Sequence, residues 1–226
     1  MKNFLKKNWR LSFLLYLFIY LPWFYYIEKT ITPGLSIIHI MHCSFDDLIP
    51  FCEYFIIPYL SWFLYVALAC LFVLYKGSDS EFFKLALTLV IGMSLSMTIC
   101  MIYPSGLHLR PVEFPRHNIF TTLVSVLYSS DTPTNVFPSV HVYNSLAIHI
   151  SLSKLKVLEN YKWVKNCSLI LCILICLSTV FIKQHSLIDV TGAIVMMIVL
   201  YVAIYVLDYS KIFARARAKR EKEVLE

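Results

Sequence analysis

Long hydrophobic runs alternate with short polar segments along the whole chain. Apolar runs of about 18 residues or more with few charges are long enough to cross the hydrocarbon core of a bilayer as helices. The pattern predicts an all-α, polytopic membrane protein whose six transmembrane helices form one bundle. The predicted spans are approximately residues 11–27, 54–74, 85–103, 137–152, 167–182 and 187–207.

Three of the polar segments between these spans bear on function. Residues 28–53 contain Pro33, Gly34 and several acidic side chains, which favours a loop with a short interfacial helix. Residues 104–136 form the longest polar connection, and long loops in compact folds are often functional. Residues 183–186 form a very short turn between the last two spans.

The composition supports a membrane protein. Of the 226 residues, 59% are hydrophobic and 15% are charged, and the mean hydropathy is +0.70. A water-soluble domain of this size normally carries about 25% charged residues. The length fits a single membrane domain over residues 1–226, without a separate soluble domain.

The distribution of charge predicts the orientation. The net charge is +6, and basic residues cluster within residues 2–10 and 211–222. Each cluster flanks an apolar run, where positive charge orients a span, so no nucleic-acid partner is expected. Basic segments favour the cytoplasmic side, which places both termini and the linkers 76–84 and 154–165 there. The three polar segments would then be extracytoplasmic, with the protein in the cell membrane.

The cysteines and most histidines do not indicate a metal site. Most of the seven cysteines lie inside apolar runs, where they behave as small hydrophobic residues. Only Cys43 and Cys52 are placed so that a disulfide is conceivable. Histidines outside the motifs described next lack metal-ligand spacing, so neither a metal nor another cofactor is expected. The oligomeric state stays open.

Chemically competent residues occur in three places on the predicted extracytoplasmic face. Ionisable side chains near membrane depth are costly, so they are functional candidates. His185 and Asp189 are four residues apart at a helix start, so the carboxylate can hold one ring nitrogen and leave the other free as a nucleophile. The alternative is an ordinary capping box formed by Ser186 and Asp189.

The other two places suit an anion. Ser139 and His141 stand at the start of a helix, where the dipole favours a phosphate and His141 can donate a proton. Alternatively, Ser139 is an ordinary N-cap and His141 an interfacial polar residue. Arg110 and Lys183 would complete a cationic pocket, although either can equally be a snorkelling anchor.

These blocks together resemble the signature of the type 2 phosphatidic acid phosphatase superfamily. That signature reads K-x6-R-P, then P-S-G-H, then S-R-x5-H-x3-D, in a six-span protein. The matching residues here are Arg110-Pro111, Pro138-Ser139-Val140-His141, and Ser178 followed by His185 and Asp189.

The chain departs from the signature at three positions. Tyr103 stands at the first lysine, Val140 at the glycine and Thr179 at the second arginine, so two phosphate-binding cations are missing. Lys183 is the candidate replacement. The sequences 137–139 and 183–185 resemble the branch of inositol phosphorylceramide and sphingomyelin synthases, which transfer phosphorylated headgroups.

The resemblance implies a role for each residue. His185 would attack phosphorus, Asp189 would orient it, and His141 would act as acid and then base. The substrate phosphate would be bound by Arg110, Lys183, Ser139, Pro111 and Ser178.

The leading hypothesis is a phosphatase that hydrolyses a membrane lipid phosphate or diphosphate on the extracytoplasmic face through a phosphohistidine. A lipid or headgroup hydroxyl as acceptor would instead make the protein a headgroup phosphotransferase. A third possibility is a non-catalytic protein that binds or transports lipid. The missing cations favour this third possibility, whereas the retained His141, His185 and Asp189 favour an enzyme.

Overall fold

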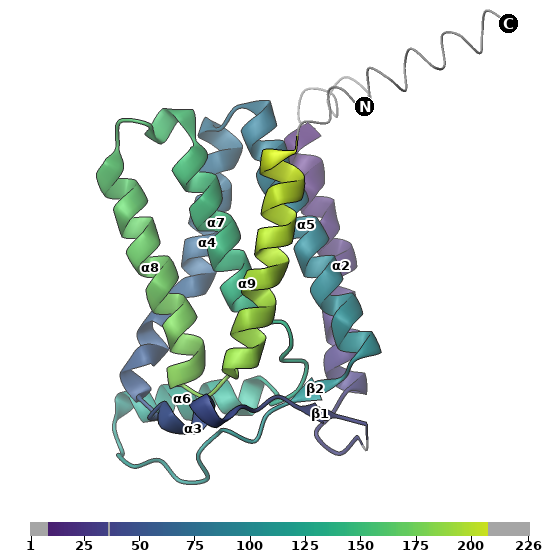
Figure 1. Cartoon of the computed structure of the whole chain (residues 1–226), viewed down its shortest axis with the longest axis vertical. Helices are drawn as coiled ribbons and strands as arrows, with labels where there is room; N and C mark the ends of the chain where they lie inside the picture. Colours follow the sequence, from purple (N-terminus) through teal and green to yellow (C-terminus); the bar gives the residue numbers. More distant parts are fainter. Residues whose placement is uncertain (1–8, 36, 208–226) are drawn as a thin grey trace, which may run out of the picture.

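The computed structural model describes residues 9–35 and 37–207, and this part of the chain is mostly helical (Figure 1). The long helices are α2 (Leu17–Thr30, continued from η1, Trp9–Tyr16), α4 (Ile56–Lys76), α5 (Asp79–Ile102), α7 (Val140–Lys154), α8 (Lys162–Phe181) and α9 (Leu187–Tyr201). The shorter elements are β1 (His39–Ile40), α3 (Ser44–Leu48), η2 (Glu53–Phe55), β2 (Ser105–Gly106), α6 (Ile119–Ser130), η3 (Lys156–Leu158) and η4 (Val202–Val206).

Within the described residues, five helical segments are long and apolar enough to cross a membrane. They are Trp9–Thr30, Glu53–Lys76, Asp79–Ile102, Lys162–Phe181 and Leu187–Val206. They coincide with five of the six predicted spans. The predicted span 137–152 corresponds to α7, whose 15 residues are fewer than the roughly 20 that a helix normally needs to span a bilayer.

Helix α7 is short and polar because other helices surround it. It contacts α4, α5, α8 and α9, and more than half of its residues are buried, including Asn144 and Ser145. Gly92 lets α5 come close: a Cβ atom there would lie 2.0 Å from the Tyr143 ring. The Tyr143 hydroxyl donates to the Thr88 carbonyl at 2.8 Å. A helix enclosed by protein in this way does not need an apolar surface of its own.

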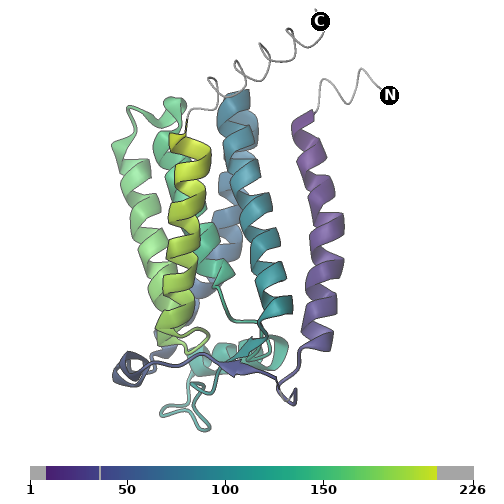
Figure 2. The same cartoon turned by 45° about the vertical axis from the view of Figure 1, so that its right-hand side comes forward.

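The outer helices carry the opposite pattern. Phe18 on α2, Leu64 on α4 and Val199 on α9 are more than half exposed. Exposed apolar faces of this extent are characteristic of helices surrounded by lipid. Helix α2 stands at the edge of the bundle beside α5 (Figure 2). Tyr20 and Ile27 of α2 pack there in one buried cluster with residues of α5.

The connections 28–53 and 104–136 lie together across one end of the bundle (Figure 1). They are joined by strands β1 and β2, which pair in parallel with His39 opposite Ser105. The predicted short helix in the first connection is α3. Helix α6 in the second connection was not predicted, because its 12 residues are too few to register as a span. Cys43 and Cys52 are free thiols.

Candidate active site

His185 lies in the turn between α8 and α9, and Asp189 lies in the first turn of α9. Their side chains are buried, and His185 Nδ1 is 3.3 Å from Asp189 Oδ2. The same carboxylate oxygen accepts a hydrogen bond from the Ser186 N–H at 2.9 Å, and the Ser186 hydroxyl accepts one from Ile188 N–H at 3.1 Å. The capping box and the contact with the histidine therefore coexist. A proton on Nδ1 leaves Nε2 unprotonated and available as a nucleophile.

His141 on the first turn of α7 faces the same region. The centres of the His141 and His185 rings are 5.9 Å apart. The Tyr59 ring stacks on His141 at 4.6 Å and the Trp62 ring lies at 4.4 Å, both from α4. Tyr59 and Trp62 are not among the predicted site residues, because aromatic residues are common in any apolar span.

Ser139 joins the start of α7 to α9. Its hydroxyl accepts a hydrogen bond from the Val142 N–H at 3.4 Å, as an N-cap does. Its own N–H donates to the Asp189 carbonyl at 3.2 Å. The Ser139 side chain thus fills its capping role, and its backbone brings the second motif next to the third.

Arg110 reaches the site from the long connection. Its guanidinium donates to the Asp131 carbonyl at 2.9 Å and to the Gln184 side-chain oxygen at 2.5 Å. It also lies 4.5 Å above the Tyr128 ring. Its Nε is buried without a hydrogen-bond partner among the described residues. Burial lowers the pKa of Arg110, against the opposing effect of Asp131, but an arginine stays protonated.

Gln184 links Arg110 to Asp131. Neither Gln184 nor Asp131 is among the predicted site residues. The Gln184 amide donates to Asp131 Oδ2 at 3.0 Å. Burial raises the pKa of Asp131, although the Arg110 charge opposes the shift. Because Gln184 directly precedes His185, this network lies against the candidate nucleophile. The position of Gln184 next to His185 is the sequence feature that could have indicated this network.

The Lys183 side chain contacts backbone carbonyls at α3, and its predicted contact with a phosphate stays a prediction. Its ammonium donates to the carbonyls of Asp46 at 2.7 Å and Ile49 at 2.6 Å, and the side chain is buried. Burial lowers the pKa of Lys183, whereas Asp46 and Asp47 act to raise it. Two of its three N–H donors therefore hold α3 against the α8–α9 turn.

Asp46 makes the complementary contacts from α3. Its carboxylate accepts from the Ser186 hydroxyl at 2.6 Å and from the N–H groups of Leu187 and Cys43, both at 2.8 Å. Burial acts to raise the pKa of Asp46, but these hydrogen bonds outweigh it and hold the pKa below its ordinary value. Together with Lys183, Asp46 fixes the turn on both sides of His185. Neither partner is visible from local sequence, because their residues are more than 130 positions apart.

The remaining motif positions have structural contacts. The buried Ser178 hydroxyl donates to the Ile175 carbonyl of its own helix at 2.6 Å, and its predicted phosphate contact stays a prediction. The Thr179 carbonyl accepts from the N–H groups of Gln184 and His185 and so closes the turn. Tyr103 stacks on His39 at 4.0 Å. Pro111 directly follows Arg110 and is partly exposed.

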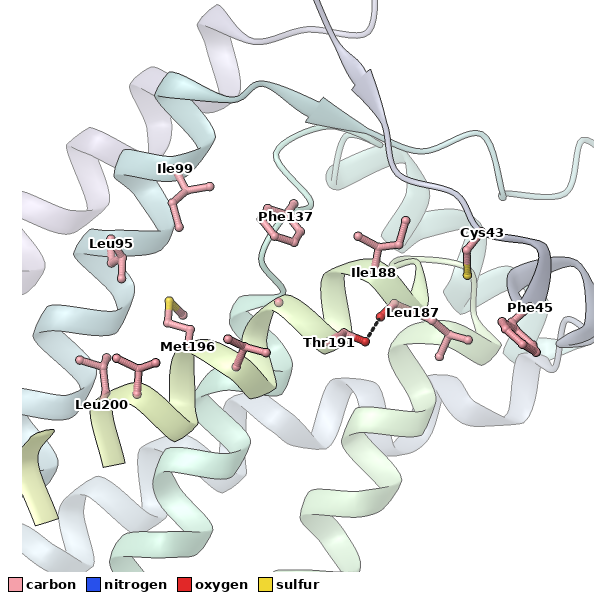
Figure 3. A pocket seen from close by; sticks show the side chains of 13 residues that line it. Cys43, Phe45, Leu95, Ile99, Phe137, Leu187, Ile188, Thr191, Met196 and Leu200 are labelled. Atoms are coloured by element: carbon pink, nitrogen blue, oxygen red, sulfur yellow. Dashed lines mark hydrogen bonds between the residues drawn. The ribbon is translucent and has the colours of Figure 1, made fainter. Parts of the chain in front are cut away.

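An apolar groove is lined by residues that adjoin the second and third motifs, although neither histidine lines it. This cavity of about 770 Å³ lies between α5 and α9, and Figure 3 shows its lining side chains. Phe137 lies just before the Ser139 motif, and Leu187 lies just after His185, so both motifs contribute a wall. Phe137 packs closely on Gly192, where a Cβ atom would come within 2.4 Å of the ring.

The arrangement thus brings two histidine rings together, with a buried carboxylate behind His185 and Arg110 bonded to the neighbouring Gln184. A family model described as the PAP2 superfamily matches residues 85–212, which is more than half of the chain and includes Arg110, His141 and His185. Comparisons with curated proteins and with solved structures give no significant match. The predicted family is confirmed, and the chain belongs to the PAP2 superfamily.

Proposed function

We propose that the protein is a membrane-integral phosphatase that hydrolyses a lipid phosphate or diphosphate through a phosphohistidine at His185. The observation that carries this proposal is the pairing of the His141 and His185 rings, 5.9 Å apart, with buried Asp189 behind His185. Members of the superfamily generally have phosphoric-ester hydrolase or phosphotransferase activity, which agrees with this arrangement.

The first half-reaction would use His185 as the nucleophile. Its Nε2 attacks phosphorus, the N–P bond forms, and the bond between phosphorus and the leaving oxygen breaks. His141 gives its proton to that oxygen. Reacting atoms typically stand about 3 to 3.5 Å apart before reaction, so the substrate phosphorus would lie within that distance of Nε2, with its leaving oxygen turned toward His141. Asp189 holds Nδ1 and stabilises the positive charge that develops on His185.

The second half-reaction would reverse these roles. His141, now neutral, removes a proton from water as the water oxygen attacks phosphorus. The N–P bond breaks, inorganic phosphate leaves, and His141 again carries its proton. Asp189 keeps its contact with Nδ1 and so holds His185 in the orientation needed for the next turnover.

Arg110 is the best placed cation for the phosphoryl oxygens. Its buried Nε has no partner among the described residues, so it can donate one more hydrogen bond. Gln184 and the Asp131 carbonyl hold the guanidinium, which avoids reorganisation during the reaction. The N-terminal end of α7 adds the positive end of its dipole. Lys183 uses two of its three N–H donors on backbone carbonyls, so we assign this residue to positioning the turn.

The groove between α5 and α9 suits the hydrocarbon part of the substrate (Figure 3). Phosphatidic acid, phosphatidylglycerophosphate and a polyprenyl diphosphate all combine a terminal phosphate with long apolar chains. We further propose that α7 is a sixth span, that the site is extracytoplasmic, and that both termini are cytoplasmic. The basic clusters at the chain ends support this orientation.

The test is phosphate release by the purified protein in detergent, with a panel of these lipids and with chelator present. We expect release by the wild type and by His117→Ala, an exposed histidine at the same end of the bundle. His185→Ala should release none. Equal release by His185→Ala would contradict the mechanism, and no release by any form would shift the proposal to headgroup transfer.

Headgroup transfer is the second candidate. Two cation positions of the family are occupied by the uncharged Tyr103 and Thr179, which are engaged in a ring stack and a turn. A site with fewer cations for free phosphate suits a diester product, which carries less charge. Incubation with a phospholipid donor and a lipid alcohol acceptor would distinguish the two reactions. A protein that only binds lipid would perform neither.

A further inference from the structure

A second groove lies at the other end of the helix pair α7 and α9, and it encloses about 500 Å³. Its apolar lining consists of Leu146, Ile150, Ile194, Met197 and Ile198. Its polar lining consists of His149, Ser153, Lys154 and Tyr201. Neither catalytic histidine contributes to it, so it is separate from the site described above.

The lining changes from apolar to polar along the helix axes. On α7 it begins at Leu146 and ends at Lys154, the last residue of the helix. On α9 it begins at Ile194 and ends at Tyr201, again the last residue. Lys154 is about 20 Å along the axis from His141, at the usual rise per residue. The groove is therefore apolar near the middle of the bundle and polar at its end.

The polar part of the groove is organised by contacts with the core. His149 Nδ1 is 3.1 Å from the Ser168 hydroxyl, and that hydroxyl is 2.7 Å from the Tyr65 hydroxyl. His149 Nε2 is 3.4 Å from the Ser153 hydroxyl. These contacts fix the imidazole and one wall of the groove in place.

Lys154 keeps its donors available. Its ammonium lies 5.1 Å from the centre of the Tyr201 ring and 6.0 Å from that of Tyr205. Among residues 9–35 and 37–207, it has no ion pair or hydrogen bond that would occupy its N–H groups. Nearby acidic groups are already engaged, since Asp79 pairs with Arg10 and Glu81 accepts from the Lys156 N–H.

We propose that this groove binds one anionic phospholipid, with its phosphate at Lys154 and its acyl chains along Leu146, Ile194 and Ile198. The apolar walls favour a lipid over free phosphate, because they offer a soluble anion no contact. The lysine favours an anionic over a zwitterionic headgroup. Basic pockets between transmembrane helices bind acidic lipid headgroups by this combination of contacts. The proposal is independent of the reaction at His185.

Native mass spectrometry of the full chain from neutral detergent would test the charge requirement. The probes are phosphatidylglycerol, phosphatidylcholine and inorganic phosphate. We expect the wild type to retain one phosphatidylglycerol in preference to the other two. Lys154→Gln should weaken this binding about fivefold, the effect of one lysine near an acidic lipid. Lys76→Gln is the matched control, because Lys76 also ends its helix, at the same end of the bundle.

A second pair of variants tests the groove itself. Ile198→Trp should fill it and reduce phosphatidylglycerol retention, whereas Ile170→Trp on α8 should not. The two isoleucines are similarly exposed, at 57% and 58%. Equal losses in both members of either pair would overturn the proposal. So would equal retention of phosphatidylcholine, or displacement of the lipid by inorganic phosphate.

Discussion

Two carboxyl groups flank the His185 turn, and their pKa values shift in opposite directions. Asp46 on the α3 side has a lowered pKa because three donors outweigh its burial. Asp131 on the α6 side has a raised pKa, because burial dominates and, among the described residues, Gln184 alone donates to its carboxylate. The number of donors directed at a buried carboxylate therefore decides which protonation state the fold favours.

The difference separates two tasks. On the α3 side, Asp46 and Lys183 bond mainly to backbone atoms and fix the conformation of the turn. On the α6 side, Arg110, Gln184 and Asp131 form a side-chain network, and the Arg110 Nε has no partner among the described residues. We infer that the first side positions His185 and the second meets the substrate.

The largest expected effect is on the α6 side. Arg110→Ala removes the cation proposed to stabilise the transition state, and loss of one such donor typically lowers kcat by about 10²- to 10³-fold. The melting temperature should fall too little for loss of folded protein to explain this drop in kcat. Steady-state phosphate release and thermal unfolding in detergent would measure the two effects. Arg10→Ala is the control, because that arginine pairs with the exposed Asp79 at the start of α5, away from the two connections that carry the site.

If Arg110→Ala and Arg10→Ala lower kcat equally, Arg110 does not contact the transferred phosphoryl group. If Arg110→Ala instead lowers kcat only in proportion to a loss of folded protein, the α6 side is structural. Either result would remove the distinction between the two sides of the turn.

The next largest effect is on stability, at Asp46. Asp46→Ala leaves the Ser186 hydroxyl and the Leu187 N–H without their acceptor, at a cost of about 1–3 kcal/mol for each buried group. Asp47→Ala is the matched control, since its side chain is 62% exposed and its ion pair is with the exposed His42. Surface changes of that kind usually stay within about 0.5 kcal/mol. Unfolding in mixed micelles would compare the two variants.

The lowered pKa of Asp46 also has a pH signature. A carboxyl whose pKa is lower in the folded state stabilises the fold above its unfolded pKa, and this contribution is lost as pH falls through the folded pKa. The wild type should therefore lose its advantage over Asp46→Ala only in acid, below about pH 4. An advantage that disappears near neutral pH would contradict the assignment.

A smaller effect is expected at Lys183. Lys183→Met keeps the length of the side chain but leaves the carbonyls of Asp46 and Ile49 without a donor, which should cost about 1–3 kcal/mol. The KM for substrate should stay within about twofold if the lysine only positions the turn. The double variant with Asp46→Ala should show a non-additive loss, because both residues hold the same segment. A large rise in KM would return Lys183 to the phosphate site.

Sequence predicted the features that depend on local pattern. Apolar length gave five segments that match candidate spans, and the spacing of four between His185 and Asp189 gave their contact. It could not give Asp46 as a partner of Ser186, because the two are 140 residues apart. Nor could it give the contacts of Lys183 with the carbonyls of Asp46 and Ile49, and its predicted contact with the phosphate stays a prediction.

The smallest expected effect on the free energy of unfolding is at Asp131, where the substitution should stabilise the protein. Asn at this position imitates the protonated carboxyl and can still accept from Gln184. Because the folded pKa is raised, the ionised wild type carries a penalty at neutral pH, and protonation removes that penalty as pH falls through the folded pKa. Asp131→Asn should therefore stabilise the protein at pH 7, by less than the loss expected at Lys183. The gain should shrink toward zero near pH 4. Melting curves of both forms across this range would measure it, and a variant that is less stable at pH 7 would show that the Asp131 charge supports Arg110 more than burial opposes it.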